Sequence, residues 1–477
     1  MKKSAVLFLL LFCVSVGTLG GLAVWVNQGA ETVVVTGETL LGDPSRAAGL
    51  ELTTHSEMRL QLGWKTAFSP DNPNQTSTDF TFYSMIPSMW ERFQTGGGAY
   101  ISIESKAITA SMTSSGELEL LNMDAIWDEF AIRPAQEISL AMGQEKERTQ
   151  TVCLSDYYDA VSLYIDFRGR MGLAGAEKQK SFEDYFYIPM PEGVYVTYTL
   201  TKNDSGGVNQ VDMTSEQQLC VTSRTARSDR GWLIVMDGWV RMAPDAPAQR
   251  LDFSQVKGGY GLYLIPSDTP EKMDAWDGSL DFNGIETLFP IPEGERGMDV
   301  CLDDQGRVLL LTAKEDVWYL TVLDPEGRTQ LQRLELGELG RDNKVLELGE
   351  LGRDNKVLEL GSGEAGLSIL MEDLQVCALS QGADGYEVEF SCSLPLEINF
   401  EEATPVSIAW DGERLAMAGI EDDSLPTHYI LAIWEKGTCT FLGRYTTSLE
   451  QDNMLTSSSL EQIEPTEKNP ISLAWSS

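Results

Sequence analysis

The sequence predicts an all-β protein, built as an array of antiparallel meanders, behind a single N-terminal transmembrane helix. Three observations lead to this fold class. The chain opens with a long uncharged stretch, most of the remainder consists of short β-forming runs separated by turn residues, and amphipathic helical patterns are scarce. Together they predict a β-rich mass on the far side of a membrane.

The N-terminal segment has the length and the flanks of a membrane anchor. Residues 4–26 carry no charge, and at 1.5 Å rise per residue a helix of this length spans roughly 34 Å, enough to cross a bilayer. Lysines precede the stretch and a tryptophan lies near its end, as expected for the cytoplasmic and the opposite interface. The residues assigned to the anchor and its ends are Lys2, Lys3, Ser4, Trp25 and Val26.

No Ala-x-Ala cleavage site ends this stretch, so we expect it to stay uncleaved; a signal peptide cut near residues 17–21 is the alternative. The expected protein is single-pass in the cell membrane, with residues 1–3 cytoplasmic and the bulk extracytoplasmic. Its expected partners are the membrane, through the anchor, and an unknown extracellular or envelope ligand.

The charge of the chain excludes one class of partner. Against 35 Lys and Arg stand 73 Asp and Glu, which gives a formal net charge of −38. Such a field repels nucleic acid, so we expect no polynucleotide ligand. Hydrophobic residues make up 42% of the chain, more than a disordered acidic chain carries, and predict a packed core.

Residues 27–290 form the first predicted extracytoplasmic β-rich region. Asp43 to Gly49 predicts one helical turn, with an aspartate cap before a proline and a glycine after its end. The run 232–236 predicts a strand, and Asp237-Gly238 after it predicts a two-residue hairpin turn. The best helical patterns cover residues 123–132 and 135–142.

Residues 291–450 carry the clearest pattern, three meanders of roughly 40–50 residues with Gly-containing or charged turns. Their predicted strands cover residues 308–312, 317–323 and 330–336; then 367–371, 376–380 and 386–391; then 406–409, 414–418, 429–434 and 439–445. At fold level this region resembles β-propeller proteins, whose blades are four-stranded antiparallel meanders. The resemblance names no family, and two stacked β-sandwiches are the alternative.

A second kind of repeat lies inside this region. Residues 334–345 recur unchanged as 346–357, which indicates a recent duplication and predicts a functionally neutral surface hairpin, since lengthening a loop costs only tenths of a kcal/mol. Residues 451–477 form a tail that is either loose or ends in a closing strand over 471–475.

Catalytic and metal motifs are weak throughout the chain. The two histidines, His55 and His428, are far apart in sequence, and no G-x-S-x-G elbow is present. Residues 361–366 match G-x-G-x-x-G, but a strand rather than a helix is expected after them, so we interpret the match as a loop. No catalytic or cofactor-binding residue is assigned.

The six cysteines beyond residue 26 are widely spaced, which favours free buried thiols over a disulfide framework. An irregular Ca²⁺ site at residues 281–286, or at Asp303-Asp304, is the one metal site considered, because oxygen ligands occur there at close spacing.

The sequence therefore predicts a membrane-anchored, extracytoplasmic binding or scaffold module of the cell envelope, and not an enzyme. The alternative is an exported hydrolase acting on glycans or peptides. A hydrolase needs convergent carboxylates in a pocket, whereas a binding module does not.

Overall fold

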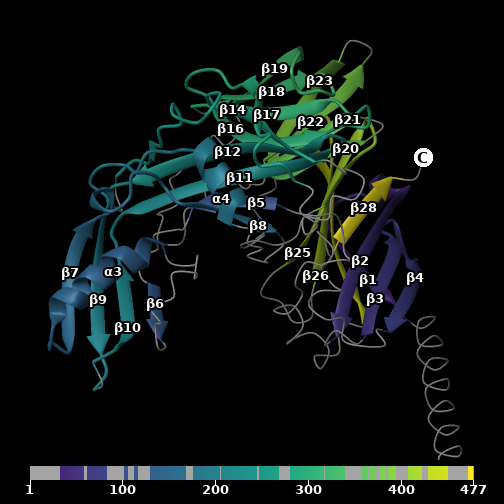
Figure 1. Cartoon of the computed structure of the whole chain (residues 1–477). Helices are drawn as coiled ribbons and strands as arrows, with labels where there is room; N and C mark the ends of the chain where they lie inside the picture. The colour runs from purple at the N-terminus through teal and green to yellow at the C-terminus, as the bar shows by residue number, and fades with distance from the viewer. Residues whose placement is uncertain are drawn as a thin grey trace, which may run out of the picture. The chain divides into compact units, whose positions relative to one another are not determined.

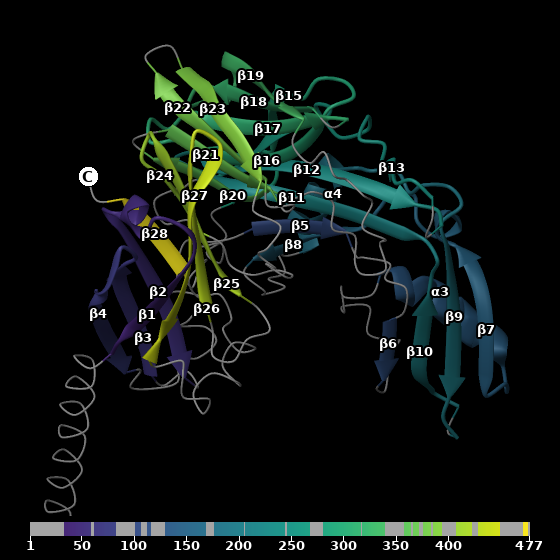
Figure 2. The ribbon, with the colours of Figure 1, turned by 180° about the vertical axis from the view of Figure 1, so that it is seen from behind.

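The computed structural model describes residues 33–58, 62–82, 101–105, 112–115, 129–167, 176–204, 206–243, 246–267, 280–315, 317–338, 357–363, 366–371, 375–382, 385–393, 407–421, 428–448 and 471–475. Over these residues the protein is an assembly of antiparallel sheets, which confirms the predicted all-β class. Two α-helices occur in the described ranges, α3 (Glu129–Met142) and α4 (Ala176–Tyr185). Figures 1 and 2 show the sheets and both helices from opposite sides.

The chain forms two compact units. Unit 1 combines residues 1–98 with 357–477, and unit 2 is the continuous stretch 99–356. The predicted boundary at 290/291 does not coincide with either break between the units. One break, at 356/357, instead lies near the end of the duplicated sequence.

Unit 1 contains three sheets, and two of them combine strands from opposite ends of the chain. One has the order β1-β27-β26-β25-β24, one β28-β2-β3-β4, and one β20-β21-β22-β23. The strands and the single 3-10 helix of this unit are β1 (Val35–Gly42), η1 (Pro44–Ala47), β2 (Leu50–Met58), β3 (Leu62–Ser69), β4 (Asn72–Phe82), β20 (Val357–Gly363), β21 (Gly366–Met371), β22 (Gln375–Gly382), β23 (Gly385–Ser393), β24 (Ser407–Trp410), β25 (Arg414–Glu421), β26 (His428–Glu435), β27 (Thr438–Thr447) and β28 (Ile471–Trp475).

Unit 2 contains four sheets. Their orders are β5-β8, then β6-β10-β9-β7, then β11-β12-β14-β15 with β13 beside β12, then β16-β17-β18-β19. The elements are β5 (Ile101–Ser105), β6 (Met112–Ser115), β7 (Glu147–Cys153), η3 (Leu154–Asp156), β8 (Leu163–Phe167), β9 (Tyr195–Lys202), β10 (Val208–Thr214), β11 (Gln218–Ser228), β12 (Gly231–Arg241), β13 (Gln249–Arg250), β14 (Gly261–Pro266), β15 (Glu286–Pro290), β16 (Arg296–Leu302), β17 (Val308–Lys314), β18 (Val317–Leu323) and β19 (Gln330–Glu338).

The strand predictions after residue 300 are confirmed with small shifts of their ends. Each of the three meanders becomes part of an antiparallel sheet, and one further strand joins each of them: β16, β20 and β1. The predicted closing strand over 471–475 is also confirmed, because β28 pairs along β2 from Leu50↔Trp475 to Thr54↔Ile471. The helical turn predicted after Asp43 is present as η1, and the Asp43 carboxylate accepts a hydrogen bond from the Ser45 amide at 3.0 Å.

The hairpin predicted at Asp237-Gly238 is wrong. Strand β12 continues through both residues and pairs with β11 along its whole length, including Val221↔Gly238 and Thr222↔Asp237. A side chain at Gly238 would press on Leu251 and Val221, so the glycine serves close packing and not a turn. The aspartate is accommodated in the strand because an arginine from another sheet reaches its carboxylate.

Two other predictions, on the helices and on the duplicated sequence, are tested only over those of their residues that the structure describes. Residues 123–128 of the first predicted helix lie outside the described residues; from Glu129 onward the two predicted helices are one helix, α3, which continues through Pro134. Residues 339–356, which hold most of the duplicated sequence, lie outside the described residues. The two flanking Leu-Glu-Leu-Gly sequences are both strands, within β19 and β20.

None of the helices in the described ranges is long and apolar enough to cross a bilayer. The predicted anchor, residues 4–26 with Lys2, Lys3, Ser4, Trp25 and Val26, lies outside the described residues and stays a prediction.

Candidate binding face

The sheet β6-β10-β9-β7 of unit 2 has one apolar and one polar face. Strand β9 alternates between them: Val196, Tyr198 and Leu200 are buried, while the residues between them are partly or fully exposed. The buried side chains belong to the same hydrophobic core as α3. One face of the sheet is therefore covered by its own helix.

Helix α3 fits this face by its residue spacing. Ala135, Ile138 and Met142 recur at intervals of three and four residues, so they lie on one side of the helix, and all three are buried. Lys202, at the end of β9, donates from Nζ to the carbonyl oxygens of Ser139 at 3.0 Å and Gly143 at 3.2 Å. A cation at the C-terminal end of a helix is favourable, so this contact fixes the helix against the sheet.

The opposite face is dominated by threonine hydroxyl groups. The register places Thr149 opposite Thr199 and Thr151 opposite Thr197, on neighbouring strands β7 and β9. Their side-chain oxygens are 2.9 Å and 2.8 Å apart, so each pair shares a hydrogen bond. Antiparallel alternation puts Thr201 and, on β10, Thr214 on the same side.

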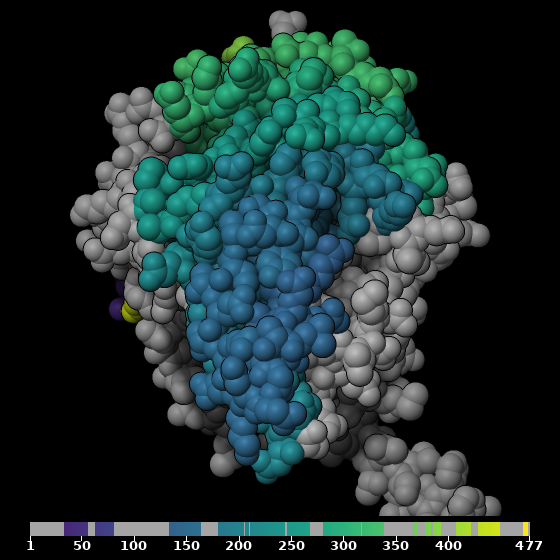
Figure 3. All heavy atoms as spheres, turned by 60° about the vertical axis from the view of Figure 1, so that its left-hand side comes forward, coloured from purple at the N-terminus to yellow at the C-terminus, as the bar shows by residue number. Residues whose placement is uncertain are grey.

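We call this surface the hydroxyl face and define it by the outward positions of β7, β9 and β10. These are Glu147, Thr149, Thr151 and Cys153; Tyr195, Thr197, Thr199 and Thr201; and Gln210, Asp212 and Thr214. Six of the eleven are threonine, two are acidic and none is basic. The layer formed by this sheet and α3 is the blue surface at the front of Figure 3.

An aromatic ring lies at one end of the hydroxyl face. Tyr195 is 49% exposed, a large value for a tyrosine within a strand. Its backbone is fixed on both sides: its amide donates to Gln217 Oε1 at 2.6 Å, and its carbonyl accepts from Ser215 Oγ at 2.8 Å. The ring is therefore presented to solvent from a rigid backbone. The nearer threonine pair lies two residues further along the strand.

One of the two acidic groups in the face accepts hydrogen bonds from a neighbour. Gln210 donates from Nε2 to both carboxylate oxygens of Asp212, at 3.2 Å and 3.0 Å. The resulting surface is rich in acceptors and lacks cations. A polyanion would find no counter-charge on it.

The buried carboxylates of the described residues lie elsewhere and are each bound by an arginine. Asp237, with its side chain 9% exposed, receives Arg296 Nε at 2.7 Å. Glu295, 7% exposed, receives Arg333 Nη2 at 2.7 Å. Asp303, 3% exposed, receives Arg307 Nε at 2.7 Å. These pairs neutralise charge inside unit 2, and removing one partner of such a pair is strongly destabilising.

The Asp237 pair is part of a wider cluster. Arg250 Nε lies 3.9 Å from the other carboxylate oxygen, and the Arg250 guanidinium lies over the Tyr260 ring, 4.2 Å from its centroid. The Tyr260 hydroxyl donates to the Met236 carbonyl at 2.6 Å and accepts from the Gly297 amide at 2.7 Å. Burial, with the nearby Asp237 carboxylate, raises the pKa of Tyr260 to about 12.

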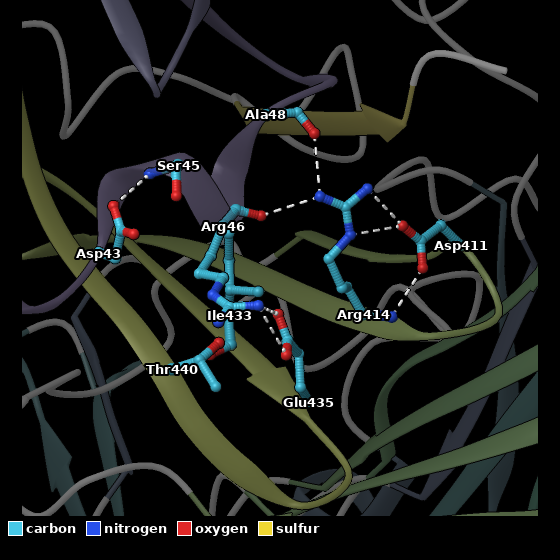
Figure 4. Close-up of polar contacts among 9 residues, drawn as sticks. All are labelled: Asp43, Ser45, Arg46, Ala48, Asp411, Arg414, Ile433, Glu435 and Thr440. Carbon is cyan, nitrogen blue, oxygen red and sulfur yellow. Dashed lines mark hydrogen bonds and ion pairs between the residues drawn. The ribbon is translucent and has the colours of Figure 1, made fainter.

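Unit 1 has a second polar cluster, which we call the latch (Figure 4). Arg414 donates from Nη1 to the carbonyl oxygens of Arg46 at 3.0 Å and Ala48 at 2.9 Å, and from Nε to Asp411 at 2.8 Å. Its guanidinium also lies 4.0 Å from the ring centroid of Trp475 in β28. One side chain thus holds η1, the β24–β25 turn and the C-terminal strand.

Neighbouring contacts complete the latch. Arg46 Nη1 binds both carboxylate oxygens of Glu435, at 3.1 Å and 3.2 Å (Figure 4). Gly42 precedes η1 with a φ of 76°, and a Cβ there would collide with the Thr440 carbonyl oxygen, so only glycine fits. Because the polar groups of the latch are used by one another, we interpret it as structural.

The metal and nucleotide motifs of the sequence resolve into turns and hairpins. The Asp281 carboxylate accepts from the Asn283 amide at 2.9 Å, and Asp303 accepts from the Gln305 and Arg307 amides. No group of three or more His, Cys, Asp or Glu side chains suited to a metal occurs among the residues described, and Ca²⁺ binding stays a prediction. The G-x-G-x-x-G match spans the antiparallel pair β20 and β21, with Gly363 opposite Gly366.

The six described cysteines are free, as predicted. Burial raises the pKa of Cys377 to about 11 and that of Cys392 to about 12, so both stay protonated near neutral pH. Cys392 and Cys439 pack against an apolar cluster of unit 1 around Trp434. They fill space and are poor nucleophiles.

The hydroxyl face was not predicted from the sequence. A signal for it exists, because Thr149-x-Thr151 and Thr197-x-Thr199-x-Thr201 place like residues on one side of two strands. The pairing of these two segments, about 46 residues apart in sequence, is what brings the hydroxyl groups together.

No protein-family model and no characterised protein matches the chain. Among solved structures it is similar to a protein of unknown function from Bacteroides caccae, with a TM-score of 0.23 and 10% identity over 52% of this chain and 68% of that one. It is also similar to a protein from Lactobacillus plantarum (TM-score 0.20, 12% identity, 55% and 67% covered). A third is Chaetomium thermophilum Sqt1 bound to the N-terminus of ribosomal protein L10 (TM-score 0.21, 10% identity, 54% and 78% covered). Similarities of this size define no family for the chain.

Proposed function

We propose that this protein is a non-catalytic binding module of the cell envelope, held at the membrane by residues 4–26 and binding its ligand through the hydroxyl face. The observation that carries the proposal is the exposed, ordered face of β7, β9 and β10. It lies on a sheet whose other side packs against α3 and the core. The bulk of the protein is extracytoplasmic in this proposal, and the ligand is an envelope component.

The arrangement of the sheets favours a propeller-like array as the scaffold. Consecutive strands form antiparallel meanders, and strands from the two ends of the chain join sheets of unit 1. Such sharing of end strands protects sheet edges and suits a closed array of blades.

The rival function, a hydrolase, has less support. Its general acid and base would have to change protonation state during the reaction. The three buried carboxylates of the described residues are each held by an arginine at 2.7 Å, so they serve the fold and are not free to contact a substrate. We therefore assign the protein no catalytic residue and no required cofactor.

Sedimentation with envelope material tests the proposal. The full chain in detergent is incubated with membrane-free cell-wall material from the producing cell, and the bound fraction is measured after centrifugation. We expect the wild type to sediment and Thr199→Arg, which puts a bulky cation in the middle of the face, to lose at least about tenfold in affinity. Thr438→Arg, at an exposed position of unit 1, is the matched control and should bind like the wild type.

Two results would contradict the proposal. Equal sedimentation of the Thr199→Arg variant would show that the hydroxyl face is not the binding surface. Release of soluble fragments by the wild type during the incubation would show that the protein is a hydrolase.

A further inference from the structure

The chemistry of the hydroxyl face narrows the class of ligand that it can bind. Each threonine hydroxyl has one donor and two acceptor sites, and the hydrogen bond within a pair uses one of each. A pair such as Thr149 and Thr199 therefore keeps one donor and three acceptor sites for a ligand. A complementary ligand must offer many hydroxyl donors and can also accept.

The charged residues of the hydroxyl face disfavour anionic ligands. None of the eleven positions is basic, so anionic polymers find no ion-pair partner. The neutral Gln210 amide binds both carboxylate oxygens of Asp212 but leaves its negative charge, and the second acid, Glu147, lies at the far end of β7. An anionic ligand is therefore disfavoured, and the predominance of threonine hydroxyl groups over charged groups favours a neutral ligand that binds through hydrogen bonds.

The geometry of the face suits an extended, repeating ligand. Neighbouring strands are about 4.8 Å apart, and alternate residues along a strand are about 6.7 Å apart, so the threonines form a regular grid of hydroxyl groups. Two ordered pairs occupy successive positions of this grid, between β7 and β9. A repeating grid matches a chain of similar units better than a compact small molecule.

Tyr195 supplies an apolar contact at the end of this grid. Sugar rings carry hydroxyl groups around their edge and C–H groups on their faces, so they pack on an aromatic ring while their edges form hydrogen bonds. Tyrosine combines both properties in one side chain. Its position beside Thr197 places stacking and hydrogen bonding on one line of strand β9.

We infer that the ligand of the hydroxyl face is a neutral polysaccharide, bound by the two threonine pairs and by Tyr195. This inference rests on the proposed function and specifies its ligand. A peptide strand would pair with a sheet edge through its backbone and not with a sheet face.

The test uses the full chain in detergent and three neutral insoluble probes: cellulose, mannan and a β-1,3-glucan. Polygalacturonate and immobilised polylysine serve as anionic and cationic counterparts. We expect the chain to bind at least one neutral probe, with an affinity that changes less than about twofold between about 50 mM and about 500 mM NaCl, because no ion pair is involved.

Isosteric variants then test the assigned side chains. Thr149→Val with Thr199→Val, and Thr151→Val with Thr197→Val, remove the hydroxyl groups and keep the side-chain shape. Each double variant should bind about tenfold more weakly, as should Tyr195→Ala, whereas Thr438→Val should be unchanged. Circular-dichroism melting of each variant establishes that it is folded, since exposed substitutions of this kind change stability little.

The possible failures are distinguishable. If the wild type binds no neutral probe but sediments with cell-wall material through Thr199, the ligand class is wrong and the binding module stands. If neutral probes bind but neither threonine pair nor Tyr195 matters, the assignment of the face is wrong. Strong binding to polylysine that disappears at high salt would overturn the neutral-ligand inference in favour of a cationic one.

Discussion

The two units of the protein differ in which parts of the chain pair inside them. Unit 1 is built from both ends of the chain: β1 pairs with β27 and β28 with β2, so residues some 400 positions apart lie side by side. Unit 2 is one continuous stretch; its sheets β5-β8 and β6-β10-β9-β7 interleave along the sequence, and the other two follow them in order. Each of the four described core clusters belongs to a single unit.

This difference assigns different tasks to the units. In unit 1, polar side chains such as Arg414 and Arg46 join distant segments and are used by the fold itself. In unit 2, the carboxylates of Asp237 and Glu295 are buried in ion pairs, and the outward face of β7, β9 and β10 is left to solvent. In the proposed function, unit 1 joins the two ends of the chain and unit 2 carries the recognition surface.

Truncating the chain after Pro470 should produce the largest effect, and it tests directly whether the two units differ in their dependence on the chain ends. It removes β28, whose Ile471 is fully buried in the core of unit 1. We expect unit 1 to lose at least about 3 kcal/mol of stability, while unit 2 is unaffected. Hydrogen exchange followed by mass spectrometry reads the two units separately. Equal loss of protection in both would refute their independence, and removal of residues 476–477 alone is the control.

Asp237→Asn should have the next largest effect and act on unit 2 alone. The variant leaves the partly exposed Arg296 and Arg250 without the counter-charge that the buried Asp237 carboxylate supplies. We expect a loss of about 3 kcal/mol in the free energy of unfolding, measured by urea titration of the full chain. Asp252→Asn is the matched control, because Asp252 is exposed in the same unit and its loss should change stability by less than about 1 kcal/mol. Similar effects of both would contradict the assigned role of the Asp237 pair.

Arg414→Ala should destabilise unit 1 by about 2 kcal/mol, since it deprives two carbonyl oxygens and Asp411 of their shared donor. Arg46→Ala removes a more exposed ion pair with Glu435 and should change stability by less than about 1 kcal/mol. Thermal unfolding monitored by hydrogen exchange in β25 and β28 measures the difference. If the two variants are equivalent, Arg414 does not hold the latch together.

The smallest effect concerns alkaline pH. Burial raises the pKa of Tyr260 to about 12, above the value of about 10 in an unfolded chain. The unfolded state therefore loses its proton first, so the contribution is complete below pH 10 and is lost between about pH 10 and about pH 12. We expect unit 2 to lose on the order of 2 kcal/mol across this range, and Tyr260→Phe to lose less. An identical pH dependence of the variant would contradict the role of Tyr260.

The sequence predicted much of the fold where local signals are strong. The strands over 317–323 and the meanders after it are confirmed because alternating β-branched residues and Gly-containing turns agree with each other. The hairpin predicted at Asp237-Gly238 is wrong because the turn preference of these residues is overridden by the contact with Arg296, which lies about 59 residues away in sequence. The division into two units is not visible locally for a similar reason: the pairing of β1 with β27 is a long-range event that no local pattern reveals.

The candidate site could be predicted only in its parts. The two threonine runs are visible in the sequence as alternating strand positions, but nothing local shows that β7 pairs with β9 in a register that puts Thr149 opposite Thr199. The sequence also does not show which threonines are exposed, since threonine is common in strands on both buried and open faces. Burial of the opposite face by α3 is what leaves this one free.

Radical footprinting of the full chain, with and without cell-wall material, tests the central claim most directly. Tyr195 at the end of the hydroxyl face and Leu140 of α3, which is 83% exposed on the other side of the same layer, both react with hydroxyl radicals in the free protein. We predict that bound material protects Tyr195 at least about fivefold and leaves Leu140 labelled as before. Protection of Leu140 with continued labelling of Tyr195, or no protection of either, would contradict the claim that the protein binds through this face.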